Sequence, residues 1–369
     1  MQGVIRYPFI SCLCLVAQRK GMDIKMKNDE FRIIKQCKTI MTFCVVFYHS
    51  CLFWGGEWFK LVQPQQVHKN ILIVAEVLGT IHVPMFVMCS GYLFFYMKRS
   101  YGRYMGNFRI ELLHRAKRLL VPYIAVSLFW CIPFDIYLNR LKCKGIVWNY
   151  LLGNSPSQLW FLLMLFVVFC FFLLVGKNLR ISIRSVLAVY FFSVIGSLVC
   201  IKLRFNCFQV QSAFRYMPIF LWGGVLQIKK NQWTQEFRKI VIVLGFSSLI
   251  VFIIYHALGL NGSLVAKVLV HFLFPILSII EITAIWCIAK MFQQYGFWDN
   301  NRIVRTIADN SFPIYLFHQQ WIYIFTVLLN GRVHWVIQLL LTFLLSIICS
   351  LVMTVILKKN VWGKMAIGG

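Results

Sequence analysis

Two ionisable residues, Lys38 and His49, stand eleven positions apart in a segment that is otherwise almost entirely apolar (TIMTFCVVFY lies between them). Eleven steps of about 100° complete about three helical turns, so both side chains fall on one helix face, about 16 Å apart along the axis. The ammonium group can hold an anion, and the imidazole can accept a proton near neutral pH. Ionisable groups inside a membrane helix usually line a path filled with water or ligand. The alternative is a snorkelling lysine beside a structural histidine.

A second imidazole, His82, opens the run HVPMFVMCSGYLFF in another apolar segment. Pro84 removes one main-chain donor, and Ser90 with Gly91 permits a close backbone approach, so we expect this helix to be distorted around a cavity. An ordinary structural kink is the alternative for Pro84 and Gly91. A kink accounts less well for the presence of His82, because an imidazole at membrane depth is costly.

Cations that could hold an anionic ligand occur in the run RAKRLLVPY, where Arg115 and Arg118 are three positions apart. This spacing makes the two guanidinium groups neighbours on a helix that starts at a membrane surface. Guanidinium forks match phosphate oxygens bidentately. Anchoring by the positive-inside rule is the alternative for either arginine alone.

A further candidate base, His318, lies in DNSFPIYLFHQQW, where Ser311, Tyr315 and His318 are spaced to share one helix face. Two other clusters, SQLWFLLML and YMPIFLWGGVL, carry polar or small residues inside apolar stretches. The 13 cysteines form no CxxC pair and no cysteine–histidine spacing suited to zinc, so we expect no metal site.

Apolar helices must position all these residues, because 60% of the 369 residues are hydrophobic, 13% are charged and the mean hydropathy is +0.73. Soluble domains do not have this composition, so we expect an all-α integral membrane protein. The formal charge of +27 comes from cations clustered at alternate ends of apolar runs, a pattern that indicates membrane orientation and not nucleic-acid binding.

About ten transmembrane helices are expected, at residues 36–54, 71–97, 119–138, 158–175, 185–201, 213–228, 240–259, 266–289, 306–329 and 335–357. Loops on the side of the N-terminus collect 27 Lys and Arg against 9 on the other side, which predicts that both termini are cytoplasmic. Residues 1–30 do not fit the helical pattern, and Met22 and Met26 are alternative starts. Residues 31–357 form one membrane domain, followed by a short cytoplasmic tail at 358–369.

Taken in order along the chain, these motifs resemble acyltransferase family 3, a family of multi-span bacterial membrane enzymes, many of which O-acetylate surface polysaccharides. The resemblance rests on Lys38 and His49, HVPMFVMCSGYLF, RAKRLLVPY, LWFL, YMPIFLWGGVL and NSFPIYLFH, and covers about residues 31–357. Family members commonly have arginine where Lys38 stands. Lysine keeps the charge there but loses the bidentate fork.

The resemblance implies transfer of an acyl group, most simply acetyl from cytoplasmic acetyl-CoA, to a hydroxyl of a surface or exported polysaccharide. His49 would be the base, with His82 and His318 as further candidates, and Lys38, Arg115 and Arg118 would hold the donor's phosphates. Direct transfer and transfer through an acyl-enzyme on Ser90, Ser311 or His49 both stay open. The implied partners are an acyl-CoA, a glycan or lipid-linked glycan and the lipid bilayer of the bacterial inner membrane.

Two other functions are compatible with ionisable residues inside helices. A transporter or flippase of a lipid-linked glycan is the first, although no inverted repeat is visible in the sequence. A non-catalytic receptor or assembly factor is the second. Labelled acetyl-CoA distinguishes them, because only the enzyme hydrolyses or transfers its acetyl group.

Overall fold

Every secondary-structure element in the described part of the chain is a helix, as the predicted all-α class requires. The computed structural model describes residues 28–56, 58, 61–101, 107–138, 143–154, 156–176, 178–229, 232–257, 264–292 and 302–369. Most of the tail expected at residues 1–30 therefore lies outside the described residues, and its last three positions begin the first helix.

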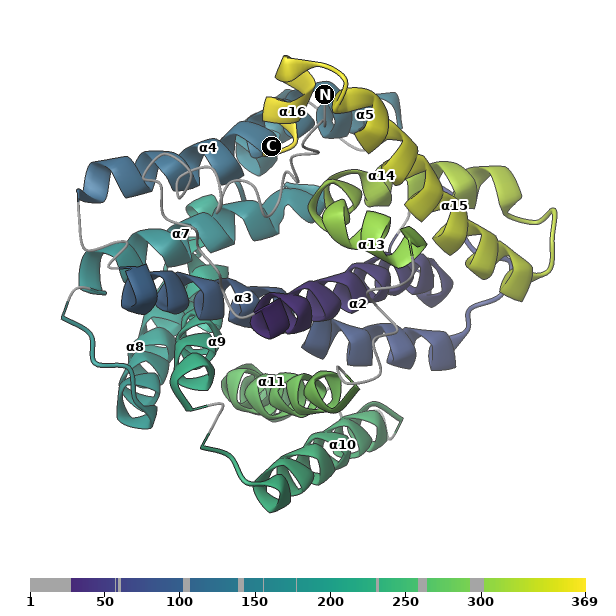
Figure 1. Ribbon diagram of the computed structural model, residues 1–369. Helices are drawn as coiled ribbons and strands as arrows, with labels where there is room; N and C mark the ends of the chain where they lie inside the picture. The colour runs from purple at the N-terminus through teal and green to yellow at the C-terminus, as the bar shows by residue number, and fades with distance from the viewer. Residues whose placement is uncertain are drawn as a thin grey trace.

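Long helices form the body of the protein (Figure 1). They are α2 (Asn28–Leu52), α3 (Lys69–Tyr101), α4 (Phe108–Val126), α7 (Trp160–Val175), α8 (Ile183–Lys202), α9 (Val210–Lys229), α10 (Gln235–Ala257), α11 (Leu264–Phe292), α14 (Ser311–Leu329) and α15 (Trp335–Leu357). The shorter elements are η1 (Phe53–Gly55), η2 (Ser127–Cys131), α5 (Ile132–Tyr137), α6 (Cys143–Ile146), η3 (Val147–Leu151), η4 (Ser157–Leu159), η5 (Cys207–Gln209), α13 (Arg302–Asp309) and α16 (Val361–Ala366).

Within the described residues, eight helical segments are long and apolar enough to cross a membrane, including α4 with its continuation through η2 and α5. The chain is therefore a multi-pass membrane protein. Helices α9 and α14 also coincide with predicted spans, but they are not among the eight. Both carry polar side chains, such as Gln227 in α9 and Gln319 in α14, and both bury most of their residues inside the protein. Ten spans therefore stay a prediction.

Helices α2 and α3 lie at the centre of the bundle (Figure 1). Helix α2 packs against α3, α14 and α11, and α3 packs against α9. Helix α10 contacts mainly α11 at the periphery, and only 6% of its membrane segment is buried, compared with 56% for α2. Lys38 and His49 of α2 and His82 of α3 thus belong to the central helices of the bundle.

Helices α3 and α9 touch at main-chain distance, because each has a glycine where the other helix passes. A methyl group on Gly91 would overlap the carbonyl oxygen of Phe220, and one on Gly223 would overlap that of Met88. Small residues allow membrane helices to pack this closely. Gly91 therefore lies in a helix contact.

Pro84 lies inside α3, and the helix continues through it without interruption. The missing N–H of Pro84 leaves the carbonyl of Thr80 without its helical donor. Ser278 of α11 takes that role, because its hydroxyl donates to the Thr80 oxygen at 3.1 Å. The carbonyl that Pro84 leaves free thus accepts a hydrogen bond that joins α11 to α3.

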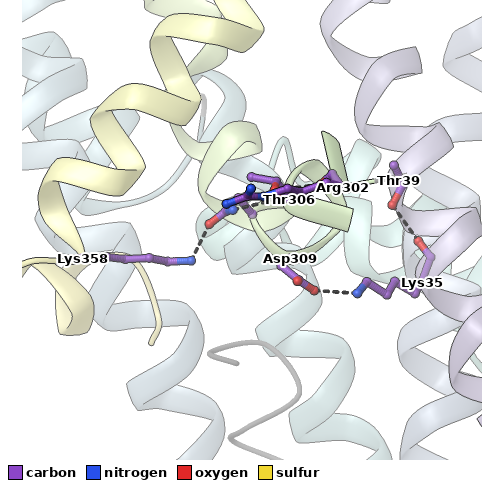
Figure 2. A network of polar contacts seen from close by, with 7 residues as sticks. Lys35, Thr39, Arg302, Thr306, Asp309 and Lys358 are labelled. Carbon is purple, nitrogen blue, oxygen red and sulfur yellow. Dashed lines mark hydrogen bonds and ion pairs between the residues drawn. The ribbon is translucent and has the colours of Figure 1, made fainter. Parts of the chain in front are cut away.

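The start of α2 and the end of α15 lie at the same end of the bundle (Figure 2). Lys35 forms an ion pair with Asp309 at 2.7 Å, and Lys358 donates to Asn310, the next residue. At the opposite end, the side chain of Asn330 donates to the main-chain oxygen of Gln63 at 2.9 Å. These contacts are consistent with an even number of membrane crossings from the start of α2 to the end of α15. That this end faces the cytoplasm stays a prediction.

Candidate functional site

A cavity of about 550 Å³ opens among the ends of several helices. Its walls come from the C-terminal parts of α2 and α10 and the N-terminal parts of α3, α7, α9 and α11, together with Gln158 of η4 and Tyr315 of α14. Because neighbouring helices run in opposite directions, these parts fall at the end of the bundle marked by Gln63 and Asn330. Lys35 does not line the cavity and lies fourteen residues before His49 on α2, about 21 Å along the helix axis.

All three histidines proposed from the sequence gather at this cavity. His49, in the last turn of α2, and His82 of α3 both line it. The ring of His318 in α14 is fully buried, and its centroid lies 5.1 Å from that of His49. Tyr48 lies between the two lining histidines, with its ring 4.8 Å from His49 and 4.9 Å from His82. Tertiary packing thus brings together imidazoles from three separate motifs.

Main-chain carbonyls fix the orientation of two of these rings. The Nδ1 of His82 lies 2.6 Å from the Leu78 oxygen, and the Nδ1 of His318 lies 2.6 Å from the Tyr315 oxygen. A carbonyl can only accept, so each Nδ1 carries the hydrogen and each neutral ring keeps its lone pair on Nε2. This is the tautomer in which Nε2 can accept a proton.

Two ring nitrogens at this site are buried without a hydrogen-bond partner among the described residues. They are Nδ1 of His49 and Nε2 of His318. A buried polar atom without a partner costs about 1–3 kcal/mol and calls for an explanation, such as a ligand or a catalytic role. Two such atoms on neighbouring rings indicate a place where a proton can be exchanged.

Gln158 connects the LWFL motif to the histidine-bearing helix α14. Its side-chain amide donates to the Leu316 oxygen at 2.8 Å and to the Gln320 side chain at 2.7 Å. The hydroxyl of Tyr315 donates to the main-chain oxygen of Gln158. These bonds hold the α14 turn that orients His318.

The predicted donor-binding cations lie apart from the cavity. Lys38 and Arg118 are close enough for their charges to interact, and Arg115 places its guanidinium carbon 4.2 Å from the ring centroid of Phe169. None of the three lines the cavity. Lys38 and His49 belong to one unbroken helix, so eleven residues place them about 16 Å apart along its axis. The three cations (Lys38, Arg115 and Arg118, hereafter the Lys38 group) and the three histidines therefore form two groups connected by α2.

The remaining candidates have local structural contacts. Ser90 donates to the main-chain oxygen of Phe86 at 2.8 Å within α3, and Ser311 is buried at the start of α14. Pro84, Ser90, Gly91 and Ser311 are not among the residues that line the cavity, whereas Tyr315 is. In the described part of the chain, no three His, Cys, Asp or Glu residues come together in a group that could hold a metal ion.

Residues 32–357 match the sequence model of a protein family described as an acyltransferase domain. The chain belongs to acyltransferase family 3. No curated protein and no solved structure shows a significant match to it. The family match extends from α2 to the end of α15 and includes both the cavity and the Lys38 group. Together with its apolar helices, membership of acyltransferase family 3 makes this protein a membrane acyltransferase.

Several polar residues of this acyltransferase cavity received no role from the sequence. The carboxyl group of Glu76 contacts the imidazole of His256, Arg215 lies against Phe274, and His271 bonds to Ser197 at 3.1 Å. The sequence does contain a signal for them, because each ionisable residue interrupts an apolar stretch. Their spacing along the chain gives no reason to group them, since they lie on four different helices, α3, α9, α10 and α11.

Proposed function

We propose that the protein is an O-acetyltransferase of the bacterial inner membrane. It would move an acetyl group from cytoplasmic acetyl-CoA to a hydroxyl of a surface or exported polysaccharide. The observation that carries the proposal is the pair His49 and His318. Their rings lie 5.1 Å apart beside a cavity, and each keeps one buried nitrogen that has no hydrogen-bond partner among the described residues.

Acyl transfer to a hydroxyl requires a base, because an alcohol becomes a strong nucleophile only as it loses its proton. In the direct reaction, the sugar oxygen forms a bond to the acetyl carbon while the bond from that carbon to sulfur breaks. The hydroxyl proton passes to the imidazole and then to the departing thiolate. The products are an acetyl ester and free coenzyme A, with no other reactant consumed.

His49 is the best placed of the three histidines to act as this base. It lines the cavity, whereas the ring of His318 lies fully buried beside it. His318 is held by the Tyr315 carbonyl and is suited to orient His49. His82 lines the same cavity with its Nε2 lone pair available and is the second candidate base.

The donor would enter from the other end of α2. Lys38 and Arg118 place two positive charges close together there, with Arg115 one turn from Arg118 on α4. Like charges held together favour a polyanion such as the phosphates of coenzyme A. The long pantetheine arm would then extend along α2 towards His49. In this arrangement the acetyl group crosses the membrane interior while the nucleotide stays at the cytoplasmic surface.

The route of transfer is direct in this proposal. Ser90 and Ser311 do not line the cavity, and the Ser90 hydroxyl donates to its own helix. His49 itself is the group through which a covalent route would pass, as an acetyl-imidazole. Rapid quenching of a single turnover with labelled donor would detect acetyl bound to the protein if the route were covalent.

Acetyl transfer by the purified protein tests the proposed function. The protein is reconstituted in lipid vesicles and given acetyl-CoA labelled in the acetyl group, together with isolated surface polysaccharide. We expect label in the polysaccharide as an alkali-labile ester. Movement of a lipid-linked glycan across the vesicle membrane without consumption of acetyl-CoA would contradict the proposal and support a flippase.

A further inference from the structure

Arg215 places a positive charge in the wall of the cavity, in the first part of α9. Its guanidinium carbon lies 3.6 Å from the ring centroid of Phe274 in α11. A guanidinium plane stacked on an aromatic face is held in orientation and loses little conformational freedom when it binds a ligand. The Nε of Arg215 is buried without a hydrogen-bond partner among the described residues.

No carboxylate among the described cavity residues neutralises Arg215. Glu76 is the acidic residue in this wall, and its carboxyl group contacts the imidazole of His256 of α10. Two ionisable neighbours sense the charge of Arg215, Tyr216 and His271, and neither is a carboxylate; His271 is bonded to Ser197. The cavity therefore contains a cation whose counter-charge does not come from its own wall.

A charge in this position is unfavourable until it acquires a partner. The guanidinium group is half-buried inside a membrane protein, where the surroundings solvate charge poorly. A bound anion would supply both the opposite charge and an acceptor for the buried Nε. Arginine is suited to this role, because its fork can donate two parallel hydrogen bonds to a carboxylate or a phosphate.

The rest of the wall has the character of a sugar-binding surface. Trp160, Tyr216 and Tyr255 contribute aromatic side chains, and Glu76 with His256 contributes polar atoms. Apolar and aromatic walls with a few well-placed polar groups are typical of sites for small organic ligands. The apolar faces of sugar rings pack against such aromatic surfaces, while a charged substituent would reach Arg215.

We infer that Arg215 binds an anionic substituent, a carboxylate or a phosphate, of the acceptor glycan. The acceptor would then be an acidic polysaccharide, and Arg215 would orient it so that a neutral hydroxyl faces His49. That the anion belongs to an acceptor of acetyl groups rests on the proposed function. The anion site itself rests only on the cavity, the Phe274 contact and the unpartnered Nε.

Binding of defined sugars tests the anion site without any acyl transfer. Three matched probes are used, a trisaccharide of glucose, the same trisaccharide with one glucuronic acid, and the same with one glucose phosphate. Each is titrated by calorimetry into the full-length protein in nanodiscs of zwitterionic lipid. We expect at least one anionic probe to bind about tenfold or more tighter than the neutral one. The difference between the two anionic probes identifies the substituent.

Substitution of Arg215 connects that preference to the residue. Arg215→Gln should abolish the advantage of the anionic probe, and Arg215→Lys should keep part of it. Arg332→Gln, which removes an exposed arginine at the same end of the bundle, is the matched control and should leave the preference intact. If Arg215→Gln does not accumulate, the Arg215→Lys protein and the salt dependence of anionic-probe binding to the unmodified protein provide the measurement.

The possible outcomes separate the anion site from the proposed function. Equal affinity of all three probes, or an anionic preference that survives in Arg215→Gln, would overturn the inference. Weakened binding of acetyl-CoA with unchanged sugar binding in Arg215→Gln would also overturn it, because Arg215 would then hold the donor. An anionic probe that binds through Arg215 but never receives acetyl would support the anion site and contradict the acetyltransferase function.

Discussion

The ring of His49 on α2 lies 5.1 Å from the ring of His318 on α14, at the edge of a cavity. Each ring has one nitrogen that is buried and lacks a hydrogen-bond partner in the described structure. The α2–α14 contact thus places two proton-accepting groups side by side, whereas in the sequence they belong to the first and last motifs of the family.

Replacing His49 should remove most of the acetyl transfer. His49→Gln keeps volume and hydrogen bonding but removes proton transfer, so we expect a fall in kcat of about 10²–10⁴-fold, the usual contribution of a general base. The measurement is initial rate with labelled acetyl-CoA, at equal protein level in the membrane. His334→Gln, at an exposed position before α15, is the control and should be fully active. Near-normal turnover of His49→Gln would transfer the role to His82 or His318.

The cations near Lys38 should govern affinity for the donor. Arg118→Ala removes a charged donor of hydrogen bonds, so we expect the KM for acetyl-CoA to rise about tenfold or more with a smaller effect on kcat. Lys38→Arg should stay active, because charge and reach are kept. The control is Arg109→Ala, because Arg109 is an exposed arginine on α4, the helix that carries Arg118. Unchanged donor affinity in the double variant Arg115→Ala/Arg118→Ala would contradict this role.

The hydroxyl of Tyr315 should stabilise the folded protein. Tyr315→Phe keeps the ring but leaves the buried main-chain oxygen of Gln158 without this donor, so the free energy of unfolding should fall by about 1–3 kcal/mol. Thermal unfolding in detergent measures the effect as a lower midpoint. Tyr137→Phe, whose side chain is exposed, should leave the midpoint unchanged. A midpoint for Tyr315→Phe equal to that of the unmodified protein would show that the bond contributes little.

The close approach of α3 and α9 should not tolerate a methyl group. Gly91→Ala would overlap the Phe220 carbonyl and force the two helices apart, an overpacking that costs about 1–3 kcal/mol. We expect less folded protein in the membrane, measured by monodisperse yield after extraction. Gly79→Ala, on the same helix, meets only the Tyr48 ring at an ordinary 3.5 Å and should accumulate normally.

The orientation of the bundle can be measured with reporter fusions. The excess of Lys and Arg predicts that the α7–α8 connection is cytoplasmic and that the α14–α15 connection lies outside. A fusion after Arg180 should therefore report cytoplasm, and a fusion after Gly331 should report the outer side. The reverse result would place the Lys38 group outside and remove the basis for a cytoplasmic donor.

Local features of the sequence were sufficient for the class of protein and for its family. Apolar stretches long enough to span a bilayer predict helices, because a main chain in lipid must satisfy its own hydrogen bonds. The motifs around Lys38, His82, Arg118 and His318 recur in order and indicate the family that the match at residues 32–357 confirms. Both are properties of short segments, and short segments can be interpreted without knowing their neighbours.

The composition of the cavity could be known only from the tertiary structure. Helical periodicity places Lys38 and His49 on one face, but it does not determine which helices that face meets. The choice depends on side-chain fit between segments far apart in the chain, as where Gly91 and Gly223 allow α3 and α9 to touch. That packing decided that His49 lies beside His318, that the Tyr315 carbonyl orients His318, and that Arg215 lies in the wall of the same cavity.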